Sequence, residues 1–359
     1  MRRETEELLR QEIARKGDLN FAEFMELALY HPQWGYYSKN SASQDYFTNV
    51  DVHSIFAEIL AHFFTITWEK NFKDGPFTLV ELGCGNGKLA RQILKTLSQN
   101  QPLFNRLQFI GIEKSASRLS ACQEIKEEFG DKINFRSQFN FPQNSLNGIL
   151  YSNEFFDALP VHRVFKKGNI LQEEKLATDA NFSLIPILKP LSLPVQEYFS
   201  WLREEPQGGC YGEAHLASRE WMQKMGQALK KGTILTIDYG FPAAELYSSF
   251  RTEGTALCHF QNKTNRNFYE KIGDQDITAH INFTVLEKEG KTWGLEPAKL
   301  QTQTDFLTRY GLEKMVGGAP SPNLDEKSKL KRSLAIRTLL HPEGMGGTFK
   351  IFLQQKGGL

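Results

Sequence analysis

The sequence predicts an α/β fold: a doubly wound parallel sheet, preceded by a helical region and interrupted by an inserted α/β subdomain. Three observations predict it. From Phe77 onward, short buried strands alternate with amphipathic helices. A glycine-rich turn joins the first strand of this alternation to its first helix. Between residues 161 and 212, prolines and short β-like runs interrupt the alternation before it resumes.

The N-terminal region, residues 1–75, is predicted to be helical. Apolar residues recur on one stripe over residues 21–29, which indicates a helix. Asp18 or Asn20 is expected to cap its start, and Pro32 follows its end. After a loop to about residue 49, a second apolar helix is predicted over residues 54–70.

The sheet and its helices are predicted to begin after this region. The expected order is strand 78–81, turn 83–87, helix 89–97, strand 108–113, helix 116–129, strand 133–135, strand 148–151, helix 218–230, strand 233–239 and strand 348–353. The core therefore comprises residues 76–160 and 213–359, with residues 161–212 inserted. The polar segment 317–332 is predicted to be a surface loop.

Composition limits the class of protein. A chain of 359 residues, of which 40% are hydrophobic and 24% charged, fits one large or two smaller globular domains. Its 43 basic and 42 acidic residues leave a formal net charge of +1, so nucleic acid is not an expected partner. The four cysteines are widely spaced, which indicates a reducing compartment. With no secretory signal and no segment apolar enough for membrane insertion, we expect a cytoplasmic protein of bacterial type.

The turn Glu81–Gly87 (ELGCGNG) indicates a cofactor site. Glycines at alternate positions allow a tight turn and let a ligand press against the main chain. A dinucleotide fingerprint would need a third glycine at position 88, where this chain has Lys88. The third glycine comes one residue earlier, and an acid precedes the first glycine by two residues. This arrangement is typical of enzymes that use S-adenosylmethionine (SAM), whose sulfonium and amino groups need a carboxylate such as Glu81.

A second acid supports the same cofactor. Glu113 closes the second strand, where a carboxylate can accept hydrogen bonds from both ribose hydroxyls. The alternative is a chance glycine turn. No metal site is predicted. The residues predicted to bind SAM are Glu81, Gly83, Cys84, Gly85, Gly87, Glu113 and Asn153.

The segment Asn153–Pro160 (NEFFDALP) is predicted to carry the chemistry. It follows the fourth strand, and ligands of doubly wound sheets bind outside the carboxyl ends of the strands, near the switch point. Glu154 is the first candidate for a catalytic carboxylate and Asp157 the second. The alternatives are a structural salt bridge for Glu154 and a helix cap for Asp157.

Taken together, these motifs resemble the MidA-like family of class I SAM-dependent methyltransferases. The resemblance covers nearly the whole chain in the right order. It is carried by residues 21–37 (FAEFMELALYHPQWGYY), 81–87, 153–161 (NEFFDALPV), 237–240 (IDYG), 276–283 (DITAHINF) and the region of Lys350. The chain departs from the family pattern at Cys84 and Asn86, where Pro and Arg are more common, and at Asn49-Val50-Asp51, where the family usually has Ser-Pro-Glu.

The resemblance implies a Rossmann-like fold, SAM as cofactor and methyl transfer to an arginine nitrogen. The family includes a mitochondrial protein-arginine methyltransferase that acts on a subunit of respiratory complex I, so a protein substrate of that type is implied here. Glu154 would pair with the guanidinium, with Asp157 as the second choice. His162 and His280 either assist or anchor the structure, and Tyr239 either lines the acceptor site or packs.

Regions outside the core are also expected to have roles. Residues 161–212 are expected to recognise the substrate, and residues 1–75 to cover the cofactor site or to form a homodimer face. Three other functions stay open. They are methylation of a small molecule or another amine, a non-catalytic assembly factor that retains a SAM pocket, and an NAD-dependent oxidoreductase, which Lys88 opposes.

Overall fold

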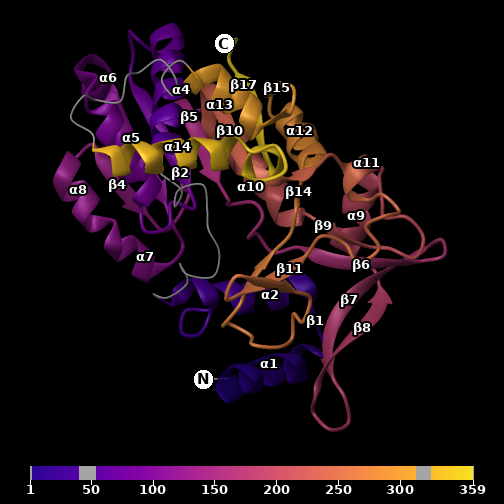
Figure 1. The fold of residues 1–359 in the computed structure, drawn as a ribbon. Coiled ribbons are helices and arrows are strands. Elements are labelled where there is room, and N and C mark those ends of the chain that lie inside the picture. The colour runs from indigo at the N-terminus through magenta and orange to yellow at the C-terminus, as the bar shows by residue number, and fades with distance from the viewer. Residues whose placement is uncertain (1, 40–53, 313–324, 359) are drawn as a thin grey trace. The chain divides into compact units, whose positions relative to one another are not determined.

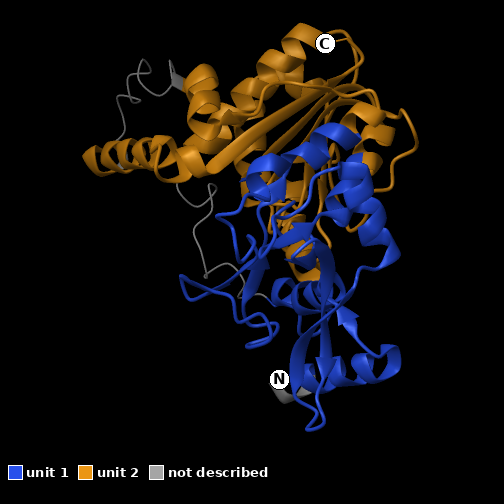
Figure 2. Ribbon diagram, turned by 90° about the vertical axis from the view of Figure 1, so that its right-hand side faces the viewer, with its two compact units in different colours: residues 1–46, 156–222, 240–289 blue, residues 47–155, 223–239, 290–359 orange. Residues whose placement is uncertain are grey.

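The structure is a computed structural model that describes residues 2–39, 54–312 and 325–358. The chain divides into two compact units, coloured separately in Figure 2. Unit 1 comprises residues 1–46, 156–222 and 240–289, and unit 2 comprises residues 47–155, 223–239 and 290–359. These boundaries differ from the predicted ones at 75, 160 and 212. The roles predicted for residues 1–75 and 161–212 stay predictions, and Asn49-Val50-Asp51 lies outside the described residues.

Unit 2 contains the predicted doubly wound sheet (Figure 1), with the strand order β15–β17–β10–β5–β2–β3–β4. The order reverses between β2 and β5, so the predicted switch point between the first and fourth strands is confirmed. The last long strand, β17, runs antiparallel to β10, and β16 also pairs with β17. The strands are β2 (Phe77–Leu82), β3 (Leu107–Ile112), β4 (Ile133–Arg136), β5 (Leu146–Asn153), β10 (Leu229–Phe241), β15 (Glu296–Pro297), β16 (Gln301–Thr302) and β17 (Phe349–Lys356).

The helices of unit 2 bury apolar faces against this sheet. In α5, Leu89, Ile93 and Leu97 are buried, and they join one core with α4 and the strands. The helices are α4 (Ile55–Asn71), α5 (Lys88–Leu97), α6 (Gln101–Arg106), α7 (Ala116–Ala121), α8 (Gln123–Phe129), α13 (Gln303–Leu312), α14 (Glu326–Leu340) and α15 (Met345–Thr348). None of the helices within the described ranges combines the length and the apolar composition that a membrane span requires.

Two predicted elements of unit 2 were wrong in detail. The helix expected over residues 116–129 is broken at Cys122, whose N–H bonds the Leu119 carbonyl at 3.1 Å with the tighter spacing of a 3₁₀ turn. Of the loop expected over residues 317–332, residues 317–324 lie outside the described residues, and the chain is helical from Glu326 onward. Residues 326–332 contain neither glycine nor proline and are rich in residues that favour helix.

Unit 1 is built on an antiparallel sheet of order β1–β7–β6–β9, with β8 paired to β7. A smaller sheet has the order β12–β11–β13, and β14 pairs with the end of β10. Helices α10 (Leu216–Ala228) and α12 (Phe283–Thr292) are shared between the units. The other elements are α1 (Arg2–Lys16), β1 (Leu19–Asn20), α2 (Phe21–Tyr30), η1 (Tyr36–Ser38), β6 (His162–Lys167), β7 (Ile170–Thr178), β8 (Leu184–Pro190), α9 (Leu193–Leu202), β9 (Tyr211–Ala214), α11 (Ala243–Leu246), β11 (Leu257–Phe260), β12 (Lys263–Asn265), β13 (Asp276–Thr278) and β14 (Ile281–Asn282).

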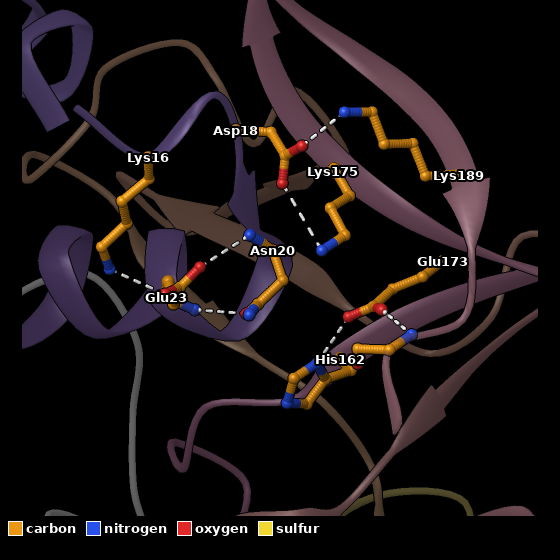
Figure 3. A network of polar contacts seen from close by, with 9 residues as sticks. Lys16, Asp18, Asn20, Glu23, His162, Glu173, Lys175 and Lys189 are labelled. Atoms are coloured by element: carbon orange, nitrogen blue, oxygen red, sulfur yellow. Dashed lines mark hydrogen bonds and ion pairs between the residues drawn. The ribbon is translucent and has the colours of Figure 1, made fainter. Parts of the chain in front are cut away.

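The start of α2 explains why this helix begins at Phe21. The Asn20 side chain accepts a hydrogen bond from the Glu23 N–H at 2.8 Å, and the Asn20 N–H donates to the Glu23 carboxylate at 2.9 Å (Figure 3). This reciprocal capping box satisfies two amides that the helix leaves open. Of the two predicted caps, Asn20 is therefore the correct one. Asp18 instead binds the amino groups of Lys175 and Lys189, its two partners in Figure 3.

Buried Arg163 connects several segments of unit 1. Its guanidinium lies 2.6 Å from the Glu174 carboxylate and 4.5 and 4.7 Å from the ring centroids of Tyr211 and Phe268. The Phe21 ring is also close, at 5.4 Å. A buried charge is tolerated only when it is paired in this way, so this cluster contributes to holding β6, β7, β9 and α2 in place.

Candidate functional site

The turn between β2 and α5 has all three glycines in the left-handed conformation. The angle φ is +65° at Gly83, +56° at Gly85 and +77° at Gly87, a region that residues with a Cβ rarely adopt. A Cβ at Gly87 would lie 2.3 Å from Cδ1 of Ile125, whereas one at Gly85 would meet no heavy atom of the described residues within 4 Å. The main chain at Gly85 is therefore open to close approach by a ligand.

Two buried oxygens lie at the carboxyl ends of the adjacent strands β2 and β5. Glu81 is 3% exposed, and burial raises its pKa to about 8, although the nearby Tyr151 hydroxyl opposes part of the rise. Within the described part of the chain, neither Oε2 of Glu81 nor Oδ1 of Asn153 has a hydrogen-bond partner. Buried acceptors of this kind are costly unless a donor reaches them. The pair fits a ligand that carries a cationic amino group.

Glu113 follows β3 and holds the glycine-rich turn in place. Its Oε2 accepts a hydrogen bond from the Gly85 N–H at 2.9 Å, and its Oε1 accepts one from the Ser115 N–H at 2.8 Å. An ionised carboxylate has about four acceptor positions, so both oxygens keep capacity for hydroxyl donors. The predicted contact of Glu113 with a ribose stays a prediction that this geometry permits.

Cys84 points its side chain into the core of unit 2. The thiol is buried, and contact with the Cys122 thiol together with burial raises the pKa of Cys84 above its usual range. Its main chain shapes the turn, because the Cys84 carbonyl accepts the Gly87 N–H at 2.9 Å. The predicted role of Cys84 in cofactor binding stays a prediction, and the buried side chain favours a main-chain contact.

The chain turns sharply after β5, at Glu154. Glu154 is half-buried and has a left-handed backbone with φ of +52°, which is uncommon for a residue other than glycine. Its N–H donates to the Ile237 carbonyl at 3.0 Å, and Nδ2 of Asn153 donates to its Oε1 at 3.0 Å. Both the backbone and the carboxylate of Glu154 are thus fixed beside the glycine-rich turn of unit 2, since β5 pairs with β2.

Asp157, the second predicted catalytic residue, belongs to unit 1. It lies in a turn rather than at the start of a helix, so the alternative of a helix cap is wrong. The Asp157 carbonyl accepts the Ala279 N–H at 2.9 Å, which ties this turn to the segment after β13. Tyr239 packs edge-on against Phe349, with ring centroids 5.6 Å apart, in agreement with the packing alternative.

The two predicted histidines both lie in unit 1. Nδ1 of His162 shares a hydrogen bond of 2.8 Å with the fully buried Glu173 carboxylate (Figure 3). Burial lowers the pKa of His280 to about 4, and its ring lies 5.5 Å from that of Phe241. These contacts support the anchoring interpretation of both side chains. His280 is neutral at physiological pH.

One residue that the sequence analysis gave no role is placed at this site by the structure. Asp238, near the end of β10, is fully buried and accepts hydrogen bonds from the N–H groups of Phe155 and Tyr239. A signal was present in the sequence. Asp238 is an acid at the end of the apolar strand 233–239, and a buried carboxylate must be hydrogen-bonded.

Comparison with known proteins decides the class of this site. Residues 59–300 match a family described as S-adenosyl-L-methionine-dependent methyltransferases, over more than half of the chain. The chain belongs to this family. SAM is the cofactor of this methyltransferase, in agreement with the prediction, and the oxidoreductase alternative is wrong. The acceptor oxygens Oε2 of Glu81 and Oδ1 of Asn153 fit the cationic amino group of SAM.

Individual relatives agree with the family. The methyltransferase is 24% identical over 375 residues to the human mitochondrial protein arginine methyltransferase NDUFAF7, covering 96% of this chain and 81% of that one. The Drosophila melanogaster homologue is 27% identical over 384 residues, with coverage of 98% and 84%. An uncharacterised protein from Burkholderia thailandensis has the same fold, with a TM-score of 0.86, 25% identity and coverage of 99% and 92%. A second structure from that organism, with S-adenosyl-homocysteine bound, has a TM-score of 0.86 at 24% identity, with coverage of 99% and 92%.

Proposed function

We propose that this methyltransferase transfers the methyl group of SAM to an arginine nitrogen of a protein. The observation that carries the proposal is the fixed Glu154 carboxylate, held 3.0 Å from Nδ2 of Asn153 at the strand end next to the glycine-rich turn. A guanidinium is cationic at any working pH and presents a planar fork of donors, which a carboxylate binds through two hydrogen bonds. The relatives named as protein arginine methyltransferases support the same acceptor.

Different residues of unit 2 are assigned to the cofactor and to the methyl acceptor. When bound, SAM supplies a methyl group on a sulfonium, which makes that carbon electrophilic. Glu81 and Asn153 accept hydrogen bonds from the amino group of the cofactor, and Glu113 accepts them from the ribose hydroxyls. Glu154 orients the guanidinium and localises its charge away from the attacking nitrogen. Most of the rate enhancement then comes from holding that nitrogen in line with the methyl group.

No strong base is needed in this scheme, because the proton can leave after the methyl group has been transferred. The histidines fit this reading. His280 is neutral, with its pKa lowered to about 4 by burial, and His162 is bound to Glu173. Asp157 stays the second candidate for contact with the guanidinium. A subunit of the respiratory complex I type as substrate stays a prediction from the family resemblance, and a homodimer stays a prediction from the helical N-terminal region.

The test asks where the methyl group goes. The purified protein is incubated with methyl-labelled SAM and a protein extract, and the labelled protein is hydrolysed and separated by chromatography with mass detection. We expect label in methylarginine, and none after boiling the enzyme. Label in small molecules alone would favour the small-molecule alternative. Label on lysine or on the N-terminus would retain the methyltransferase and reject arginine.

A further inference from the structure

Asp238 connects the ends of two neighbouring strands of unit 2. Its side chain is fully buried. Oδ1 accepts the N–H of Tyr239 at 2.9 Å, and Oδ2 accepts the N–H of Phe155, the residue after Glu154, at 3.3 Å. One carboxylate thus binds a main-chain amide of β10 and a main-chain amide that follows β5. These two strands are paired, with Asn153 in register with Ile237.

The segment that Asp238 holds is strained. A residue with a Cβ is destabilised in the left-handed region relative to the right-handed one, and Glu154 adopts this conformation with φ of +52°. Such a conformation persists only where the surroundings impose it. Hydrogen bonds from the Glu154 N–H to the Ile237 carbonyl and from the Phe155 N–H to Asp238 impose it here.

The side chain of Phe155 also packs against the glycine-rich turn. A Cβ placed on Gly83 would lie 2.8 Å from Cδ2 of Phe155, so the aromatic ring lies directly on the first glycine of the turn. A shift of the Phe155 main chain would therefore move Glu154 on one side and release the ring from Gly83 on the other. The position of the Glu154 carboxylate and the packing against Gly83 are therefore coupled through the Phe155 main chain, which Asp238 binds.

We propose that Asp238 is a positioning residue that sets the Glu154 carboxylate for methyl transfer and acts through the hydrogen bond to Phe155. This inference rests on the proposed function of Glu154. It also gives a role to the fully buried side chain of Asp238 near the end of β10. An ionised carboxylate can accept from two amides at once, whereas the side chain of asparagine has one acceptor oxygen and turns a donating NH₂ toward the second amide.

The test is a double-mutant cycle with Asp238→Asn and Glu154→Gln. The rate is the initial transfer of label from methyl-labelled SAM to extract protein. We expect Glu154→Gln to lower the rate at least ~100-fold, and Asp238→Asn to lower it ~10- to 100-fold, because a misplaced catalytic group loses rate on that scale. The double variant should be no more than ~3-fold slower than Glu154→Gln, since residues that act through one another are not additive. A double variant whose loss of rate equals the product of the two single losses would overturn the inference.

A second measurement does not depend on activity. Amide hydrogen exchange of the peptide that contains Phe155 should be at least ~10-fold faster in Asp238→Asn, since an amide that loses its acceptor loses protection. The matched control is Glu289→Gln, which also neutralises a buried carboxylate, one bound by Arg219 at 2.8 Å. That variant should leave exchange at Phe155 unchanged. Unchanged exchange in Asp238→Asn would overturn the inference even if its activity were low.

The outcomes separate this inference from the proposed function. Full activity of Glu154→Gln would reject the role of Glu154, while the exchange data would still show whether Asp238 anchors the turn. If Glu154→Gln loses activity but the effects of Glu154→Gln and Asp238→Asn on the rate multiply in the double variant, the proposed function is kept and the role of Asp238 is rejected. If Asp238→Asn does not fold, Asp238→Glu is used, which keeps both acceptor oxygens. We expect it to retain more activity than any neutral substitution at this position.

Discussion

SAM binding should displace a proton from Glu81 at neutral pH. Burial raises the pKa of this carboxyl to about 8, so about 0.9 of the molecules carry the proton at pH 7, half at pH 8 and about 0.1 at pH 9. A cationic amino group against Oε2 favours the ionised carboxylate. The Glu81 contribution is then release of about 0.9 proton per SAM at pH 7 and about 0.1 at pH 9. The ratio of wild-type affinity to Glu81→Gln affinity should rise about tenfold over that range for the same reason.

Calorimetry in buffers of different ionisation enthalpy measures this release. The slope of the apparent binding enthalpy against the ionisation enthalpy of the buffer gives the number of protons exchanged. Glu81→Gln is the control, because protons exchanged by the ligand itself and by other groups cancel in the difference between the two proteins. A difference near zero at pH 7, or a net uptake by the wild type relative to Glu81→Gln, would refute the contact between Glu81 and the amino group.

Three further predictions concern the cofactor contact and stability. Glu113→Ala should weaken SAM binding at least ~30-fold by calorimetry, because it removes the acceptor of the Gly85 and Ser115 N–H groups as well as the predicted ribose contact; unchanged affinity would reject the predicted site. Arg163→Met should lower the free energy of unfolding by about 3–5 kcal/mol in urea, because it leaves the buried Glu174 carboxylate without its cationic partner, and Arg163→Met with Glu174→Gln should recover part of that loss. The pKa of fully buried His215 is lowered to about 3, from a usual value of 6.5, so its stabilising contribution is complete above pH 6.5 and is lost as pH falls toward 3. Thermal unfolding should show a loss of about 3 kcal/mol between pH 6.5 and pH 4 that His215→Phe removes, and an equal slope in that variant would contradict the assignment.

The parts of the fold that sequence predicts are those whose signals are local. The strands around Glu81 and Glu113 are short buried runs, and the reversal between β2 and β5 follows from the general order of doubly wound sheets. The break at Cys122 could not be predicted in this way. It coincides with a contact of the Cys122 thiol with the Gly85 carbonyl at 3.5 Å, between residues 37 positions apart.

The candidate site likewise contains residues with a local sequence signal and residues without one. The glycine-rich turn and Glu154 are predictable because glycine spacing and acids after strands have direct chemical meaning. Asp238 is harder to assign, because its partners, Phe155 and Tyr239, are identified only once β5 and β10 are paired. The cluster around Arg163 joins residues from positions 21 to 268, and no pattern within one segment indicates it. The grouping of residues 240–289 with residues 1–46 and 156–222 in unit 1 likewise depends on contacts between segments far apart in the sequence.

The most direct test of the account is a single-turnover measurement on Glu154→Gln. The variant and the wild type are each loaded with methyl-labelled SAM, the bound fraction is measured, and protein acceptor is added. We expect equal loading, because no cofactor contact is assigned to Glu154, and at least ~100-fold slower formation of methylarginine by the variant. Equal loading with an unchanged rate of methylarginine formation would contradict the central claim that this carboxylate directs methyl transfer to arginine.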